Sequence, residues 1–204
     1  MSKLKHLIWL ALFCAAPAFA GAQIYEPLSA SVQAAMSKSI SDQAVETTLT
    51  DTPAARAWLS EMSRRLAKRL PDREYRNDLL ATIYYEASRA GLDPEMVMGL
   101  IEVESGFNKY AVSSVGARGF MQVMPFWVQQ IGTPEQNLFH LRTNLRYGCT
   151  ILRHYLDIEQ GDLFRALGRY NGSLGKPEYP NMVKAAWHRH WAKPQQIITA
   201  RSNG

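Results

Sequence analysis

The segment spanning residues 92–125 constrains this chain most, because it opens with a helix that carries a carboxylate on its apolar side. Asp93 and Pro94 predict the helix start, since an Asp side chain can accept hydrogen bonds from unpaired backbone N–H groups and Pro fits the first turn. Gly106 predicts the end, because glycine readily takes the left-handed cap conformation. At 100° per residue, one side of this helix carries Val97, Leu100, Ile101 and Glu104, and the solvent side carries Glu95 and Glu102.

The position of Glu104 has a chemical consequence. Apolar surroundings disfavour the ionised carboxylate and raise its pKa, and the partial negative charge at a helix C-terminus acts in the same direction. A carboxylic acid that is still protonated near neutral pH can serve as a general acid. The alternative is a structural role, in which Glu104 bonds to nearby backbone or to Ser105 at the helix end.

The residues after Glu104 favour the catalytic interpretation. In order, the chain reads Glu104-Ser105, Ser113, Gly116-Ala117, Gly119-Phe120-Met121-Gln122 and Met124-Pro125. This pattern resembles the soluble lytic transglycosylase-like (SLT) family of peptidoglycan lytic transglycosylases, with Phe120 where that family usually has Leu. Farther along, Tyr170-Asn171-x-Ser173 resembles the family's Ala-Tyr-Asn-x-Gly, with Arg169 and Ser173 as departures. The resemblance extends over about half of the chain, from Tyr84 to Trp187.

The resemblance implies an all-α, lysozyme-like domain of the goose-type lysozyme/SLT class, with a short N-terminal helical extension. Helical periodicity agrees with it, and the chain has no convincing strand alternation and no internal repeat. We expect a signal peptide at 1–20, an extension with one helix at 21–71, the catalytic domain at 72–192 and a flexible tail at 193–204. Helix starts are expected at Thr52-Pro53, Asp72, Asp93, Pro125, Thr143, Asp162 and Pro180, with a weak helix near Ser31 to Ser41.

Residues 1–20 have the three parts of a secretory signal. Lys3 and Lys5 form a basic start, an apolar run follows from Leu7 to Ala16, and Ala18-Phe19-Ala20 is an Ala-x-Ala cleavage site. We therefore expect cleavage after Ala20 and export across the inner membrane to the periplasm. Cys149 would then be the sole cysteine, so we expect a buried, inert thiol and no intramolecular disulfide.

The net charge of the chain limits which classes of binding partner are compatible with it. The formal net charge is +5, and it falls to +3 once the two lysines of residues 1–20 are removed. Such a mild excess is compatible with an anionic cell-wall polymer or a membrane surface. Nucleic acid is not indicated, because the chain has no long basic run, zinc-finger spacing or aromatic RNA-binding motif.

A single carboxylate limits the chemistry available near the motif. Residues 105–134 contain no Asp or Glu, whereas most glycosidases use two carboxylates. The resemblance implies a different nucleophile, the 6-hydroxyl of the substrate's own N-acetylmuramic acid. Glu104 would protonate the glycosidic oxygen and then accept the proton of that hydroxyl, which gives a 1,6-anhydro sugar. No metal and no organic cofactor is implied.

The remaining site residues are expected to bind substrate. Gln122 is an amide among apolar residues, so a hydrogen bond to a sugar would satisfy it if it is buried. Met121 is expected to line the sugar subsite, although Met at this spacing also suits a core, and Gly119 to allow close backbone approach. The resemblance adds Ser105, Ser113, Tyr170 and Asn171 to the substrate-binding set.

Several functions remain open at this stage. The leading hypothesis is a monomeric lytic transglycosylase that acts on peptidoglycan glycan strands, either in wall remodelling or in opening the wall for a cell-envelope secretion machinery. The second is a lysozyme-type hydrolase that uses water. The third is a non-catalytic wall-binding or assembly protein that keeps the fold.

Overall fold

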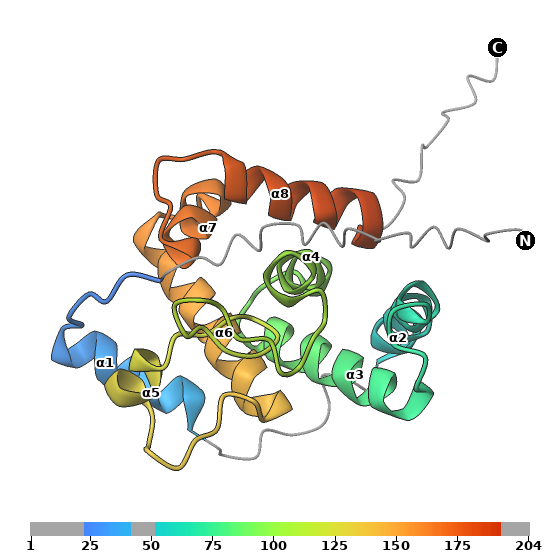
Figure 1. Ribbon diagram of the computed structural model, residues 1–204, viewed down its shortest axis with the longest axis horizontal. Helices are drawn as coiled ribbons and strands as arrows, with labels where there is room; N and C mark the ends of the chain where they lie inside the picture. Colours follow the sequence, from blue (N-terminus) through green and yellow to red (C-terminus); the bar gives the residue numbers. More distant parts are fainter. Residues whose placement is uncertain (1–22, 42–51, 193–204) are drawn as a thin grey trace, which may run out of the picture.

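Helices form nearly all of the regular structure in residues 23–41 and 52–192, the residues that this computed structural model describes (Figure 1). Within these ranges, β-structure is limited to isolated bridges of Arg118 with Val112 and with Val123. The expected all-α fold is therefore confirmed for the described residues. The helices are α1 (Ala30–Ile40), α2 (Pro53–Leu66), α3 (Arg73–Arg89), α4 (Pro94–Ser105), α5 (Phe126–Ile131), α6 (Leu141–Ile158), α7 (Leu163–Asn171) and α8 (Glu178–Ala186), followed by the π-helical turn η2 (Trp187–Trp191).

The expected signal peptide at 1–20 and the expected tail at 193–204 lie outside the described residues. In the part of the chain that is described, none of the helices is both long and apolar enough to cross a membrane.

Local capping signals fix several helix starts where the sequence predicts them. The Asp93 carboxylate accepts from the N–H groups of Glu95 and Met96, at 2.7 and 3.1 Å, and Gly106 ends α4 in the left-handed region with φ of +57°. Asp72 and Asp162 cap α3 and α7 in the same way. Two starts differ from the prediction: α6 begins two residues before Thr143, and α8 begins at Glu178, so that Pro180 lies inside its first turn.

Helix α4 lies at the centre of the molecule, where α3, α8 and η2 pack around it (Figure 1). Its residues Met98, Leu100 and Ile101 are fully buried. Gly99 permits the close packing of η2, because a Cβ atom there would lie only 2.8 Å from the Trp187 backbone nitrogen. Helix α4, which carries Glu104 near its carboxyl end, is thus held between α3 on one part of its surface and α8 and η2, which come from the C-terminal part of the chain.

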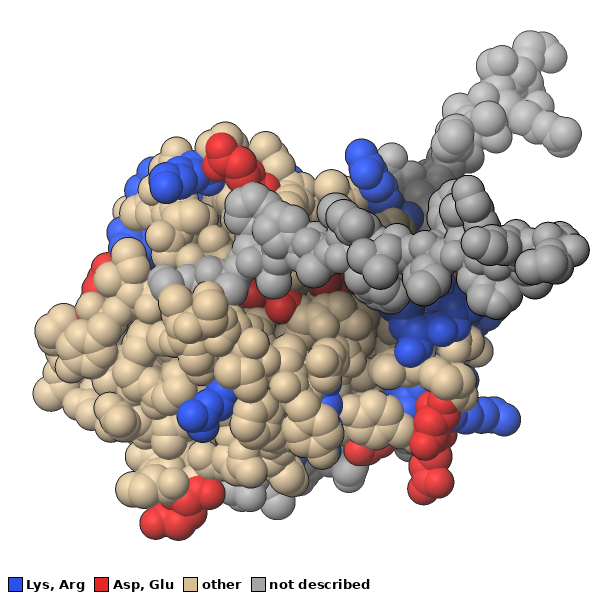
Figure 2. All heavy atoms as spheres, in the orientation of Figure 1, with Lys and Arg blue, Asp and Glu red and all other residues tan. Residues whose placement is uncertain are grey.

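The stretch 21–71 contains the helices α1 and α2. Both agree with the helices expected near Ser31 to Ser41 and from Thr52-Pro53, although the division of the chain counted only one helix there. Helix α1 packs on α5 and α6 through the buried residues Met36 and Ile40, and α2 packs on α3 through Trp58, Met62 and Leu66. Both helices therefore share the core of residues 72–192. Figure 2 shows a cluster of Lys and Arg at the end of the molecule occupied by α2, while uncharged residues cover most of this face.

Candidate active site

Glu104 and Glu102 occupy the last turn of α4 but have different surroundings. The Glu104 side chain is half-buried on the side of the helix that also carries the buried residues Val97 and Ile101. Glu102 was expected to face solvent, and this expectation is wrong: its side chain is only 12% exposed. The turn η2 covers it, and its carboxylate accepts from Trp191 Nε1 at 2.7 Å and from Arg69 at 2.5 Å.

The pKa of Glu104 is the main chemical feature of the site. Burial raises it from an ordinary value of 4.5 to about 8, and a hydrogen bond from the Tyr179 hydroxyl to Glu104 Oε1 acts in the opposite direction. Tyr179 lies on α8 and is itself buried, and its own pKa is raised well above 10 by burial and by the Glu104 charge, so it remains a donor. At neutral pH Glu104 is therefore mostly protonated and able to donate a proton.

Ser105 and Ser113, both predicted to bind substrate, hydrogen-bond backbone groups in this structure. The Ser105 hydroxyl donates to the carbonyl oxygen of Phe120 at 2.8 Å, which ties the end of α4 to residues 106–125, here called the active-site loop. The Ser113 hydroxyl accepts from the Ala117 N–H at 3.0 Å and closes a turn inside the same loop. Both hydroxyls thus shape the loop, and their contact with a substrate stays a prediction.

Gly119 and Gln122 give the active-site loop its unusual backbone. Gly119 has φ of +76°, and a Cβ atom there would lie 2.4 Å from Asn144 Nδ2 and 2.8 Å from the Leu138 carbonyl oxygen. Gln122 has φ of +48°, a conformation that non-glycine residues adopt at a cost. Its side-chain Nε2 donates to the carbonyl oxygens of Gly119 and Ala111, at 2.9 and 3.1 Å. The buried amide that the sequence flagged is therefore bonded to its own loop through nitrogen, and a sugar contact remains a prediction.

Met121 is a core residue in this structure rather than a wall of a sugar subsite. Its side chain has 0% exposure, and a Cβ atom added at Gly148 would lie only 2.3 Å from its sulfur. The backbone explains this placement, because the Met121 N–H donates to Asn144 Oδ1 and the Met121 carbonyl accepts from the Tyr170 hydroxyl at 2.7 Å. Both bonds hold the residue against α6 and α7, with its side chain in the core.

Tyr170 and Asn171 lie at the end of α7 beside this loop. Tyr170 is buried, and after burial the Glu104 charge is the next largest cause of its raised pKa, which places the two side chains in electrostatic contact. Asn171 is 9% exposed, and its buried side-chain nitrogen has no hydrogen-bond partner. A buried donor without a partner is uncommon, and it is available to a ligand.

Two residues that organise the site were missed by sequence reasoning. Asn144 donates to the carbonyl oxygens of Arg118 and Leu138, at 2.8 Å each, so one buried amide pins three backbone groups. Its signal was available, because it is a polar residue on the apolar face of α6 beside Leu145. Tyr179 gave no such signal, since it stands in a Gly/Pro-rich stretch 75 residues after Glu104.

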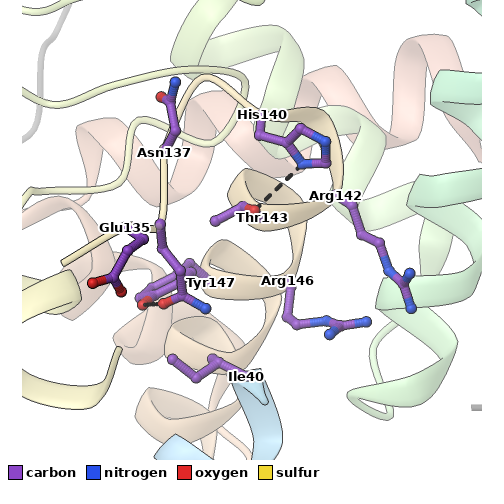
Figure 3. A pocket seen from close by; sticks show the side chains of 9 residues that line it. Ile40, Glu135, Asn137, His140, Arg142, Thr143, Arg146 and Tyr147 are labelled. Atoms are coloured by element: carbon purple, nitrogen blue, oxygen red, sulfur yellow. Dashed lines mark hydrogen bonds between the residues drawn. The ribbon is translucent and has the colours of Figure 1, made fainter. Parts of the chain in front are cut away.

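The structure also contains cavities that Glu104 does not line. One cavity, of about 330 Å³, is lined by residues of α6 and of the 135–140 loop. Figure 3 shows Tyr147 beside Glu135 of that loop, while the Arg146 side chain points away from it. A second, of about 780 Å³, lies between Arg118, Pro125 and the 132–139 segment, and a third, of about 520 Å³, is lined by Arg69, Tyr75 and residues 106–110. None of these three includes Glu104. Among the described residues, no three His, Cys, Asp or Glu side chains gather closely enough to hold a metal ion.

Comparison with known proteins supports the motif assignment. Residues 81–182, half of the chain, match the family model of the Transglycosylase SLT domain. The Transglycosylase of Enterobacteria phage PRD1 is 33% identical over 104 residues, which cover 51% of this chain and 38% of the phage protein. The Membrane-bound lytic murein transglycosylase C of Histophilus somni (strain 2336) is 44% identical over 112 residues, which cover 47% of this chain and 31% of that protein.

The matched region spans less than two fifths of the length of these curated relatives. Among solved structures, an inactive mutant of the lytic transglycosylase Slt from Pseudomonas aeruginosa matches with 20% identity and a TM-score of 0.43, over 69% of this chain and 26% of that one. The family-model match, together with the motif around Glu104, settles the family: this chain belongs to the transglycosylase SLT domain family.

Proposed function

We propose that this protein is a peptidoglycan lytic transglycosylase, a lyase that cleaves the β-1,4 bond between N-acetylmuramic acid and N-acetylglucosamine. The single observation that carries the proposal is Glu104, a carboxylic acid whose pKa of about 8 keeps it protonated at neutral pH at the end of a family motif. The name of the Histophilus relative, a lytic murein transglycosylase, agrees with this substrate.

The proposed reaction has two steps at one residue. Glu104 gives its proton to the glycosidic oxygen, the bond from that oxygen to C1 of N-acetylmuramic acid breaks, and N-acetylglucosamine leaves with a 4-hydroxyl group. The ionised Glu104 then accepts the proton of the 6-hydroxyl as that oxygen forms a bond with C1. The nucleophile is already part of the reacting sugar, so its attack is favoured by proximity, and no water is consumed.

Three carboxylates outside the motif, Asp157, Glu159 and Asp162, are candidates for a second catalytic group, and each is engaged in another contact. Glu159 binds Arg165 and Arg169, and Asp157 binds Arg153 at 2.6 Å. Asp162 caps α7 through a hydrogen bond to the Arg165 N–H. Together with the absence of Asp and Glu from residues 105–134, this favours a one-carboxylate mechanism over that of a hydrolase with two.

The site of action follows from the substrate. The proposed enzyme works in the cell envelope, in the periplasm after cleavage of residues 1–20, as a monomer on glycan strands. Wall remodelling and local wall opening for a secretion machinery both fit this chemistry.

A substitution at Glu104 tests the proposal directly. Glu104→Gln keeps the shape and the acceptor for Tyr179 but has no acidic proton, so the rate of glycan cleavage is expected to fall about 10²- to 10⁴-fold. The measurement is mass spectrometry of digested peptidoglycan, in which the wild type yields anhydro products lighter by one water than hydrolysis products. Glu178→Gln is the matched control, because Glu178 is an exposed carboxylate next to Tyr179 and its loss is expected to leave the rate nearly unchanged.

Three other results would contradict the proposal. Products that have gained water would identify a hydrolase. Binding of glycan by the wild type without any cleavage would identify a wall-binding protein. Full cleavage by Glu104→Gln would remove Glu104 from the mechanism.

A further inference from the structure

Gln23 contacts the active-site loop from outside the segment that matches the family model, which begins at residue 81. Its side chain is buried, with 4% exposure, although the residues that follow it are not: Ile24 and Tyr25 are 58% and 59% exposed. Burial of an amide is costly unless its polar atoms find partners. The chain therefore inserts one polar side chain from an exposed segment into the molecule, and its partners reveal what it does there.

The Gln23 amide bonds to three elements of the site. Its Oε1 accepts from the Trp127 indole N–H at 3.0 Å and from the Met124 backbone N–H at 3.2 Å. Both partners can only donate, so the orientation of the amide is determined. The Nε2 atom then faces the Gln122 carbonyl oxygen at 3.5 Å.

The residues after Gln23 hold it in register. The Tyr25 ring packs edge-on against Phe126 of α5, with ring centroids 5.5 Å apart. Gln130 of α5 donates from its side chain to the Glu26 carbonyl oxygen at 2.9 Å. The segment is thus tied along α5, and Gln23 enters the loop from a fixed position.

Gln23 and Asn144 hold neighbouring peptide groups on either side of a strained residue. Asn144 binds the N–H of Met121, and Gln23 binds the carbonyl of Gln122 and the N–H of Met124. Between these contacts, Gln122 keeps φ of +48°, a conformation that persists only where the surroundings impose it. The strain lies beside Ser105 and Tyr170, which join this loop to the end of α4 and to α7.

We propose that Gln23 is a positioning residue, which holds the active-site loop in the conformation that the Glu104 reaction requires. This inference rests on the proposed function. Without the Gln23 amide, the Trp127 indole N–H and the Met124 N–H lose their acceptor, and the loop is free to relax away from its strained form. The N-terminal segment is then part of the catalytic machinery by position, although it touches no reacting atom.

The test compares Gln23→Ala with Gln33→Ala in the full chain. Gln33 is the matched control, because it is also an N-terminal glutamine whose amide bonds a backbone group, but it is exposed and its partner is the Gln130 carbonyl oxygen of α5 rather than the loop. For Gln23→Ala we expect faster amide hydrogen exchange in residues 119–128 and a fall of about tenfold in kcat with KM within about twofold. For Gln33→Ala we expect both quantities to stay close to wild type. Near-UV circular dichroism checks that each variant is folded at the assay temperature.

Gln23→Glu adds a second test, the pH dependence of cleavage, which a role of Gln23 in packing alone would not change. A protonated carboxyl offers one acceptor and one donor, as the amide does, whereas the ionised form has lost the donor. We therefore expect the cleavage rate of Gln23→Glu, divided by that of the wild type, to rise as the pH falls. This ratio also decides the case if Gln23→Ala does not fold.

The outcomes separate this inference from the proposed function. Unchanged hydrogen exchange in Gln23→Ala, kcat within about twofold of wild type, or a flat pH ratio for Gln23→Glu would overturn the role of Gln23. A wild type that forms hydrolysed products overturns the proposed function but leaves the kcat comparison valid. If the wild type cleaves nothing, the proposed function falls, and the exchange measurement, which needs no substrate, decides whether Gln23 holds the loop.

Discussion

One hydroxyl group limits how far burial raises the pKa of Glu104. The Tyr179 O–H donates to the carboxylate, and a hydrogen bond to the charged form stabilises that form. Burial is the larger influence, so the pKa still stands at about 8. The proton of Glu104 is therefore held strongly enough to be present at neutral pH and weakly enough to be donated.

Tyr179→Phe is expected to move the pH dependence of cleavage. Removal of the hydroxyl takes away the hydrogen bond that lowers the pKa of Glu104, so this pKa rises above 8 and the acid stays protonated to higher pH. The alkaline limb of the rate profile should shift upward by about 1 pH unit. Initial rates on soluble glycan fragments from about pH 5 to about pH 10 measure it. Tyr110→Phe, at an exposed ring, is the control, and a limb that moves downward would contradict the role given to Tyr179.

At this scale the sequence located Glu104 but not its surroundings. Periodicity places Glu104 on the apolar side because that depends only on spacing within one helix. Glu102 was assigned to solvent by the same rule, and the rule failed because η2 folds over that side of α4. For Met121 the sequence left both a sugar subsite and the core open. The structure places its side chain in the core, because the direction of a loop side chain depends on distant partners such as Asn144.

The active-site loop is an element whose shape depends on the absence of a side chain. Gly119 combines a left-handed backbone with contacts from Asn144 and Leu138 that leave no room for a Cβ atom. Gly116, in the same loop, also has positive φ, of +88°, but has nothing within 4 Å of a Cβ position. An Ala substitution at Gly116 would therefore cost only the strained backbone conformation, whereas one at Gly119 would also cause a steric clash.

Gly119→Ala is expected to destabilise the protein by about 2–4 kcal/mol, because strain and overpacking act together. Gly116→Ala is expected to cost only about 1 kcal/mol, from backbone conformation alone. Urea unfolding followed by circular dichroism gives both free energies of unfolding. Equal losses in the two variants would mean that the Asn144 contact imposes no constraint on the loop.

Local signals explain why some elements were predictable and others were not. The starts of α3, α4 and α7 follow from the Asp side chains that cap them, and such a capping signal involves only a few consecutive residues. Helix α1 was expected near Ser31 to Ser41 and is present, but its own pattern is weak, and contacts with α5 and α6 fix its position. Tertiary packing, which the sequence does not display, decides such a helix.

For the molecule as a whole, one buried carboxylate joins three helices. Glu86 of α3 is fully buried and binds Arg89 at 2.9 Å and Arg146 of α6 at 3.0 Å. The same two arginines donate to the carbonyl oxygens of Ser39 and Ser41, at 2.6 and 3.1 Å, and so hold the C-terminal end of α1. Residues that the sequence assigned to an extension are thereby bound to the catalytic domain.

Glu86→Gln is expected to destabilise the whole protein by about 3–5 kcal/mol, because it removes a buried carboxylate from the arginines around it. Glu61→Gln is the matched control: Glu61 binds Arg64 and Arg65 at the surface, and a surface pair contributes under about 1 kcal/mol. Urea unfolding measures both, and limited proteolysis at α1 reports whether that helix is released. A loss at Glu86 as small as that at Glu61 would show that the buried cluster does not hold the three helices together.

The insertion of Gln23 has a consequence for where this protein can be cut. A fragment excised at the limits of the recognised homology, residues 81–182, would lack the amide that bonds Met124 and Trp127, as well as α1 and α2, which complete the core. The stretch that matches the family model is thus smaller than the part of the chain that shares one hydrophobic core. Engineering of this chain, whether by fusion, domain exchange or immobilisation, should keep residues 23–41 attached and unobstructed.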